Sequence, residues 1–423
     1  MKKIRVLVFP AGEINSIELH DALATCVNVE LWGASSIERH GKYVYKNYIS
    51  GLPMISSPDF IEKFNELLVD KQIDVVFPTH DTVAMFLADN EEKIQAKIIV
   101  AHKETAEICR DKEKTYNALK GGWFLPKTYS LIDRFPVFIK PKESQGAVGA
   151  QLIRNREDIP PVDLDKYVIC EYLPGREYTV DCLTDLSGRL LGAFPRSRNR
   201  LMAGVTVSGQ TELLTEDIKQ IAEFINSKLK FRGLWWFQIK EDINRKWKLL
   251  EVSTRCAGTM GLTRARGVNL PLLSVYVTMG YPVTIEQNSY DVETDRTLIS
   301  RYSISYEYDT VYFDFDDTLI VDGLVNLKAI FFLYQCRNSK KKIVLLTKHM
   351  QKLQKTMEQF AIAKNLFTEV THIKPTENKA DYIKPLGAIF VDNSFQERKV
   401  VAEKHKIPVF DVDAIDVLLD WRS

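Results

Sequence analysis

The sequence predicts a multidomain chain, with α/β units at both ends and an α+β unit between them. Its 423 residues exceed the roughly 150 of an ordinary domain, which indicates two or three domains. Short apolar strands alternate with amphipathic helices at first, β-rich stretches with glycine-bearing turns follow, and the alternation then returns. We therefore predict domains at 1–105, 106–308 and 309–423.

Three apolar runs mark the strands of the first domain, at 4–9, 27–32 and 73–78. Between the last two, Ser57 is the expected N-cap of a helix and Pro58 its first residue. Strands separated by such helices predict a parallel, doubly wound sheet. The turn after the first strand, PAGEIN, lacks GxGxxG, so we expect no dinucleotide site there.

Composition and charge argue against a nucleic-acid-binding protein, a membrane protein and a disulfide- or zinc-stabilised fold. The 57 Lys and Arg against 56 Asp and Glu create no overall field toward nucleic acid or an anionic membrane. The six cysteines lack a CxxC pair or metal-ligand spacing, which argues against a disulfide framework or a structural zinc. Pro10 and Glu13 end the N-terminal apolar run early, and no segment approaches the ~20 apolar residues of a membrane span. We expect a cytoplasmic protein without nucleic-acid or membrane partners, and the sequence leaves homo-oligomerisation open.

A lysine and a glycine-bearing loop in the middle domain suggest a phosphate site. VFIKPKESQGAVGA places Lys140 at the end of an apolar strand, before a loop whose backbone N–H groups can approach phosphate oxygens. An exposed strand end with a flexible hairpin fits this pattern equally well.

A second polar set follows in the same domain. KLLEVSTR puts Glu251, Ser253 and Arg255 on one face of a strand, because alternate residues share a face. Gln238 lies one hairpin earlier. Oxygens from two adjacent strands can bind Mg2+, and an arginine beside them can bind an anionic substrate. A half-exposed hairpin with polar residues facing water is the alternative.

Six motifs in this order resemble the ATP-grasp superfamily over about residues 1–305. They are DKxxT (111–115), KPxxxxGAxG (140–149), EYLPGREYTVD (171–181), RxRxxxxxG (196–204), ExxTR (251–255) and RxxGxNLP (264–271), with the Gln-bearing strand among them. The sequence is closest to the branch similar to the carbamoyl-phosphate synthase large chain and carboxylate-amine ligases. The first domain resembles the α/β domain that precedes the grasp.

The resemblance implies a role for each matching residue. ATP would be bound by Lys112 and Lys140 at the phosphates, by the loop with Ser144, Gly146 and Gly149, by Glu171, Tyr172 and Leu173 at the adenine, and by Glu177 at the ribose. Mg2+, or alternatively Mn2+, would be bound by Gln238, Glu251 and Ser253, the last standing where the family has Asn. Arg255 would stabilise the transferred phosphoryl group, and Arg196, Arg198 and Arg266 would bind the carboxylate substrate.

A cluster of aspartates opens the last domain, in VYFDFDDTLIVDG (311–323). Asp314 and Asp316 share one side of an extended segment, and two close carboxylates require a cation or a shared proton. An acidic N-cap cluster would explain Asp316 and Asp317 but not Asp314 at the strand end. Carboxylates at the C-terminal ends of parallel strands are where α/β folds build sites.

Four motifs over 309–423 resemble the haloacid dehalogenase (HAD)-like hydrolase superfamily. They are DFDDTL, Thr347 after KIVLLT, Lys379 in ENKADYI, and FVDNS with Asp392 and Asn393. The resemblance implies Asp314 as the nucleophile, Asp316 as general acid and base, Thr347 and Lys379 as phosphate ligands, and Mg2+ on Asp314, the Asp316 carbonyl and Asp392. Because only about 30 residues separate the first motif from the second, and a similar number the second from the third, we expect a Rossmann-like domain without a large cap.

These observations predict a bifunctional enzyme. The ATP-grasp part would join a small-molecule carboxylate to an amine, and the HAD-like part would hydrolyse a phosphorylated metabolite. One alternative is a carbamoyl-phosphate synthase-like enzyme that uses bicarbonate, although there is one grasp unit and no glutamine-hydrolysing motif. Another is a nucleotide-binding or scaffold protein, with Ser253 and Asn393 as departures from the two family patterns.

Overall fold

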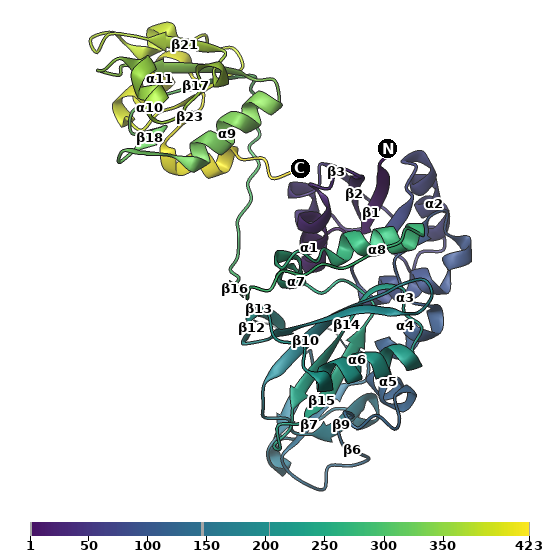
Figure 1. Ribbon diagram of the computed structural model, residues 1–423. Helices are drawn as coiled ribbons and strands as arrows, with labels where there is room; N and C mark the ends of the chain where they lie inside the picture. The colour runs from purple at the N-terminus through teal and green to yellow at the C-terminus, as the bar shows by residue number, and fades with distance from the viewer. Residues whose placement is uncertain (1, 145–147, 203, 423) are drawn as a thin grey trace. The chain divides into compact units, whose positions relative to one another are not determined.

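The computed structural model describes residues 2–144, 148–202 and 204–422 (Figure 1). The chain divides into two units, Met1–Leu298 with Arg422–Ser423, and Ile299–Trp421, which are described separately below. The predicted border between 105 and 106 lies inside the first unit, so the three-domain division stays a prediction. Within the described ranges, no helix has both the length and the apolar character needed to cross a membrane.

The first unit begins with a five-stranded parallel sheet in the order β3-β2-β1-β4-β5. The strands are β1 (Ile4–Phe9), β2 (Val29–Ser35), β3 (Asn47–Ser50), β4 (Val75–Pro78) and β5 (Lys97–Ile98). The helices are α1 (Ile14–Leu23), α2 (Phe60–Asp70), α3 (Asp81–Asp89) and α4 (Lys103–Arg110), with short 3-10 helices η1 (His40–Tyr43) and η2 (Glu91–Lys93). The parallel sheet expected from the sequence is therefore present.

The start of α2 differs from the sequence prediction. The helix begins at Phe60 with Asp59 as its N-cap, rather than after Ser57. Phe60, Phe64 and Leu68 are fully buried at spacings of four residues, so packing against the sheet determines which residues form the helix.

The rest of the first unit contains three antiparallel sheets, in the orders β11-β10-β14-β15, β6-β9-β7-β8 and β12-β13-β16. The strands are β6 (Thr128–Tyr129), β7 (Val137–Pro141), β8 (Gln151–Ile153), β9 (Tyr167–Glu171), β10 (Glu177–Thr184), β11 (Leu190–Ser197), β12 (Arg200–Met202), β13 (Val205–Gln210), β14 (Gly233–Glu241), β15 (Trp247–Ser253) and β16 (Glu293–Asp295). The helices are α5 (Lys112–Ala118), α6 (Glu216–Lys228), α7 (Gly261–Ala265), α8 (Leu270–Met279), η3 (Arg156–Asp158) and η4 (Leu164–Lys166).

The two faces of the β11-β10-β14-β15 sheet have different compositions. On one face, apolar side chains of β10 and β14 pack with α6 in a buried core, and these include Tyr178, Val180, Cys182, Trp235, Phe237, Ile239, Ile218 and Ile221. Because side chains alternate along a strand, the intervening residues face the other way. They are Thr179, Asp181, Trp236 and Gln238, and register places Thr179 opposite Gln238 and Asp181 opposite Trp236.

The second unit is built on a five-stranded parallel sheet in the order β21-β20-β17-β22-β23. Its strands are β17 (Thr310–Phe313), β20 (Lys342–Thr347), β21 (Glu369–His372), β22 (Ala388–Val391) and β23 (Val409–Phe410), with the hairpin β18 (Ile320–Val321) and β19 (Leu324–Val325) after β17. The helices are α9 (Leu327–Asn338), α10 (Leu353–Gln359), α11 (Phe395–His405), η5 (Lys364–Leu366), η6 (Lys379–Tyr382) and η7 (Val412–Leu418). The C-terminal ends of β17, β20 and β22 meet at one edge, where Asp314, Thr347 and Asp392 lie.

Candidate functional sites

A cavity of about 510 Å3 lies in the first unit and collects most of the ATP-grasp candidates. Those that line it are Lys112, Lys140, Ser144, Glu171, Tyr172, Leu173, Glu177, Arg196, Arg198, Gln238, Glu251 and Arg255. Gly149, Ser253 and Arg266 are not among its described lining residues, and Gly146 lies outside the residues that the structure describes. Residues separated by up to 143 positions in the sequence thus share one cavity.

Two lysines bring positive charge to this cavity. Lys140 ends β7, and its Nζ lies 2.6 Å from Tyr116 Oη and 2.8 Å from the carbonyl oxygen of Leu250. Burial lowers the pKa of Lys140, because the charged ammonium loses its water. Lys112 begins α5, which Asp111 caps, and its Nζ lies 3.1 Å from Ser144 Oγ and 3.8 Å from Glu251 Oε2. Both ammonium groups are placed to gain from an anionic ligand.

Gln238 and Glu251 are direct partners on β14 and β15. With the Gln238 amide oriented to satisfy its neighbours, its nitrogen donates to Glu251 Oε1 at 3.3 Å and its oxygen accepts from Arg198 Nη1 at 2.9 Å. Ser253 Oγ, by contrast, donates to Asp81 Oδ1 at 3.1 Å. Carboxylate and amide oxygens suit Mg2+, which commonly takes its remaining ligands from water and substrate phosphates. A cation held by Gln238 and Glu251 would need the Gln238 amide to turn, so that its oxygen leaves Arg198 and faces Glu251.

The arginines of the cavity already have partners within the protein. Arg196 Nε and Nη2 lie 2.8 and 3.0 Å from the two carboxylate oxygens of Asp181, and its Nη1 contacts Thr259 Oγ1. Arg198 Nε donates to Glu177 Oε1 at 2.7 Å. Outside the lining, Arg266 Nε donates to the Asn288 carbonyl at 2.9 Å. Their predicted roles in binding the carboxylate substrate stay predictions.

Arg255 is held from the parallel-sheet part of the unit. Its Nε lies 2.9 Å from Oδ1 of Asp81, the first residue of α3, and its guanidinium lies 5.3 Å from the Trp236 ring centroid. The same carboxylate oxygen accepts from Ser253. Asp81 therefore ties the end of β15 to α3.

The Arg196–Asp181 pair yields a stability prediction. Its side chains are only 2% and 0% exposed, so Arg196→Met leaves a buried carboxylate without its main partner. We expect a loss of about 3–5 kcal/mol in the free energy of unfolding, measured by urea unfolding followed by Trp fluorescence. Arg200→Met is the matched control, because the Arg200–Asp295 pair is 61% and 64% exposed and should contribute less than about 1 kcal/mol. Equal losses in the two variants would contradict this interpretation of Arg196.

Several lining residues come from loops that the sequence analysis set aside. Glu13, Ile14 and Asn15 follow β1, and Thr79 and His80 follow β4. The prediction of no dinucleotide site, made from the missing GxGxxG, concerned only the turn after β1, and no role was predicted for the loop after β4. The available signal was the position of these loops, because loops at the carboxyl ends of parallel strands are where α/β sheets place ligands.

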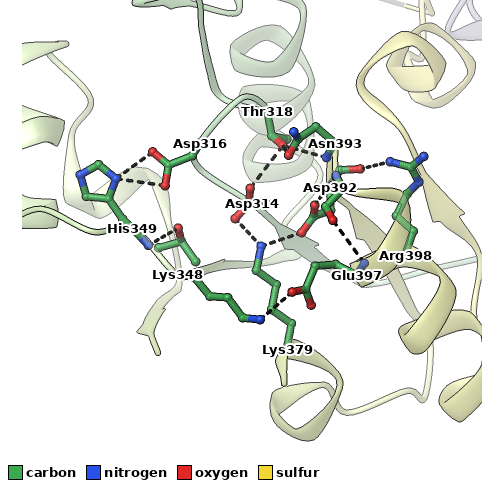
Figure 2. A network of polar contacts seen from close by, with 12 residues as sticks. Asp314, Asp316, Thr318, Lys348, His349, Lys379, Asp392, Asn393, Glu397 and Arg398 are labelled. Carbon is green, nitrogen blue, oxygen red and sulfur yellow. Dashed lines mark hydrogen bonds and ion pairs between the residues drawn. The ribbon is translucent and has the colours of Figure 1, made fainter. Parts of the chain in front are cut away.

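A lysine joins two aspartates in the second unit, as Figure 2 shows. Lys379 Nζ lies 2.6 Å from Asp314 Oδ1 and 2.6 Å from Asp392 Oδ2. Burial raises the pKa of Asp314 to about 7, while the Lys379 charge acts to lower it. Burial also raises the pKa of Asp392. The arrangement is a buried nucleophile candidate with a cation and a second carboxylate in direct contact.

Asp316 points toward a histidine that the sequence analysis did not consider (Figure 2). Nδ1 of His349 lies 2.8 and 3.0 Å from the two Asp316 oxygens, and its Nε2 lies 2.8 Å from Thr356 Oγ1. The His349 amide donates to Thr347 Oγ1 at 3.2 Å. His349 lies two positions beyond Thr347, and this spacing after a strand end was the signal available in LLTKH.

The neighbouring residues complete this network. Lys348 Nζ lies 2.6 Å from Glu397 Oε1, and the Asn393 amide donates to Thr318 Oγ1 at 3.0 Å.

In the described ranges, no group of three or more His, Cys, Asp or Glu side chains is placed to hold a metal ion. A cation between Asp314 and Asp392 would therefore also use main-chain oxygens, as the predicted Asp316 carbonyl provides. These hard oxygen donors fit Mg2+.

Comparisons with known proteins match part of the first unit to a family model. Residues 163–299 match the family model described as ATP-grasp in the biosynthetic pathway with Ter operon. A stretch of 130 residues is 28% identical to 3-methyl-D-ornithine--L-lysine ligase of Methanosarcina barkeri (strain Fusaro / DSM 804), covering 30% of this chain and 35% of that protein. The chain thus spans about a third of the length of this curated relative.

Solved structures agree on the fold. The biotin carboxylase domain dimer of Hydrogenobacter thermophilus 2-oxoglutarate carboxylase, in complex with MgADP, ADP and bicarbonate, gives a TM-score of 0.55 at 17% identity, covering 68% of this chain and 72% of that one. An L-amino acid ligase from Bacillus licheniformis gives 0.52 at 15% identity, covering 66% and 74%. The chain has a mixed α/β fold with an ATP-grasp region. The family model ends at residue 299, so it does not test the HAD-like prediction for 309–423.

Proposed function

We propose that the first unit is an ATP- and Mg2+-dependent ligase that joins a small carboxylate to an amine. The observation that carries this proposal is the meeting of Lys112, Lys140 and the Gln238–Glu251 pair in one cavity of about 510 Å3. The ammonium groups match phosphate oxygens, and the oxygen pair matches a divalent cation. The ATP-grasp match of residues 163–299 and the partial likeness to an amino-acid ligase support the same reaction class.

In this proposal, ATP lies along the cavity with its phosphates between Lys112 and Lys140. Glu171, Tyr172 and Leu173 contact the adenine, and Glu177, which accepts from Arg198 and Lys240, contacts the ribose. When bound, Mg2+ supplies charge neutralisation at the phosphate oxygens. Arg255, held by Asp81, stabilises the phosphoryl group during its transfer to the carboxylate.

The proposed ligase reaction has two steps, phosphorylation of the carboxylate and attack of the amine on the acyl-phosphate. A carboxylate oxygen attacks the γ-phosphorus of ATP, and the bond to the bridging oxygen breaks to release ADP. The amine then attacks the carbonyl carbon of the acyl-phosphate, inorganic phosphate leaves, and the nitrogen loses a proton to give an amide. Positioning and charge neutralisation suffice for both steps, so no nucleophilic side chain is required.

A substrate screen with the wild-type chain tests the ligase. ADP release is measured with ATP, Mg2+ and a panel of L-amino acids and sugar acids as carboxylates, with amines added in turn. We expect release that depends on one carboxylate, and a product whose mass equals carboxylate plus amine minus water. Substrate-independent hydrolysis alone would count against the ligase, and bicarbonate-dependent release would favour the carbamoyl-phosphate alternative. ATP binding in calorimetry without turnover on any substrate would favour a nucleotide-binding module.

For residues 299–421 we propose a HAD-like phosphatase. Contact of buried Asp314 with Lys379 and the pairing of Asp316 with His349 support this proposal. Asp314 would attack the phosphorus to form an aspartyl-phosphate, Asp316 would protonate the leaving oxygen, and water would then hydrolyse the intermediate. Phosphate release from p-nitrophenyl phosphate and from a panel of sugar phosphates tests it, and no release from any of them would contradict it.

The contact between His349 and Asp316 gives a prediction about leaving groups. His349→Leu removes both ring nitrogens, including the Nδ1 that contacts both Asp316 oxygens, so the general acid loses its orientation. We expect kcat/KM to fall about tenfold or more for a sugar phosphate, whose leaving group needs a proton, but only about twofold for p-nitrophenyl phosphate. Equal losses on both substrates would indicate a structural role for His349 instead.

A further inference from the structure

Three residues that line the ATP-grasp cavity carry a buried polar atom with neither a hydrogen-bond partner nor an ion pair among the described residues. The atoms are Trp236 Nε1, Thr179 Oγ1 and Thr206 Oγ1, and they belong to residues that are 4%, 1% and 2% exposed. Buried polar groups in native proteins are nearly always hydrogen-bonded, because an unpaired one loses its water without compensation. Unpaired groups on a cavity wall therefore indicate a ligand that binds there.

The position of Trp236 along β14 separates it from the predicted ribose contact, whereas Thr179 lies level with Gln238. Side chains at 240, 238 and 236 of β14 share one face, which lines the cavity. Lys240 contacts the predicted ribose ligand Glu177, Gln238 pairs with Glu251, and Trp236 lies beyond them. The face therefore runs from the predicted ribose contact, past the metal pair, to Trp236.

The far end of this face is also where the phosphoryl group would be transferred. The Arg255 guanidinium lies 5.3 Å from the centroid of the Trp236 ring. Thr179 lies directly opposite Gln238 on β10, and Thr206, on β13, lines the same cavity. A substrate bound at these residues would lie next to both the metal pair and Arg255.

The chemistry of the three groups selects an anion with several acceptor atoms. An indole N–H can only donate, threonine hydroxyls can donate, and the guanidinium of Arg255 donates as well. A carboxylate has two oxygens that only accept. Arg196 and Arg198, which the sequence analysis predicts to bind the carboxylate substrate, form ion pairs with Asp181 and Glu177.

We propose that Trp236 Nε1 and the hydroxyls of Thr179 and Thr206 bind the carboxylate that is phosphorylated. The inference rests on the proposed ligase activity and assigns its acceptor subsite to these residues. Trp236 is then a specificity-determining residue. Its N–H holds one carboxylate oxygen while the other faces the γ-phosphate.

Trp236→Phe tests the subsite, because it keeps an aromatic ring and removes the N–H. The probe is the amino acid or sugar acid that gives the highest kcat/KM in the screen. A lost hydrogen bond to a charged group corresponds to a rise of about tenfold or more in the KM for that carboxylate, while the KM for ATP stays within about twofold. Thr179→Val and Thr206→Val should raise the same KM and leave that for ATP unchanged.

The neighbouring tryptophan provides a matched control. Trp235 lies on the opposite face of β14, where its Nε1 donates to Thr184 Oγ1 at 2.9 Å. Trp235→Phe should lower the melting temperature without changing the KM for the carboxylate. If Trp236→Phe does not fold, the KM for the carboxylate measured with Thr179→Val and Thr206→Val tests the subsite instead.

The outcomes separate the inference from the proposed function. Carboxylate-dependent ADP release with an unchanged carboxylate KM in all folded variants would overturn the subsite and leave the ligase standing. No carboxylate-dependent release by the wild-type chain would overturn the ligase and the subsite together. Equal rises in the KM values for carboxylate and ATP would also overturn the subsite, since they indicate a general disturbance of the cavity.

Discussion

Replacing Glu251 by glutamine should lower the kcat for carboxylate-dependent ADP release by at least about a hundredfold. Glu251 is a carboxylate that lines the cavity, opposite Gln238 on the neighbouring strand and 3.8 Å from Lys112 Nζ. The amide has almost the same shape but no charge, so it weakens the binding of Mg2+ and leaves Lys112 with less compensation. The rate is measured by a coupled ADP assay at saturating carboxylate and amine.

Replacing an exposed glutamate by glutamine is the control for the general effect of a Glu→Gln substitution on the rate. Glu223 lies on α6, is 53% exposed and forms an ion pair with Lys219 at 3.9 Å, so Glu223→Gln should keep the wild-type rate. Calorimetry then distinguishes binding from chemistry. We expect Glu251→Gln to bind ATP with a much reduced dependence on Mg2+. Wild-type turnover by this variant would remove Glu251 from the proposed site.

Asp314→Asn should abolish phosphate release from p-nitrophenyl phosphate, with a loss of at least about a thousandfold. An amide oxygen is a poor nucleophile, so the aspartyl-phosphate cannot form. The variant also replaces one of the two carboxylates that lie 2.6 Å from Lys379 Nζ, which weakens the compensation of that buried charge. The assay follows p-nitrophenolate absorbance over time.

Asp322→Asn is the control within the same unit. Asp322 is exposed in the turn between β18 and β19 and has a positive φ of 50°, a conformation that asparagine tolerates well. We expect this control to keep full phosphatase activity. ADP release by Asp314→Asn should equal that of the wild-type chain, because Asp314 belongs to the proposed phosphatase alone. Retained phosphate release in Asp314→Asn would show that another residue is the nucleophile.

Local patterns were sufficient to predict some parts of the site. Strand alternation put Glu251 and Arg255 on one face, and both line the cavity, whereas Ser253 bonds Asp81. The strand ends put Asp314, Thr347 and Asp392 at one edge of a parallel sheet. Both kinds of inference depend only on the two-residue period of a strand and on chain direction. The mixed α/β fold could be predicted for the same reason.

Contacts between distant residues could not be predicted in this way. Arg196 was expected to bind substrate, but whether an arginine is free depends on what faces it, and Asp181 on the neighbouring strand binds it through two nitrogens. Ser253 bonds Asp81, which is 172 positions earlier in the chain. The His349–Asp316 contact likewise joins two separate strand ends, so the spacing in LLTKH could mark His349 but not its partner.

The position of Asp81 restricts how the parts of the first unit could be recombined. This residue lies in the parallel-sheet part, yet its carboxylate contacts both Arg255 and Ser253 at the end of β15. A chimaera in which residues 1–105 are exchanged for those of another ATP-grasp protein would remove this carboxylate unless the donor supplies one at the same place. The two segments therefore have to be inherited, or engineered, as a matched pair.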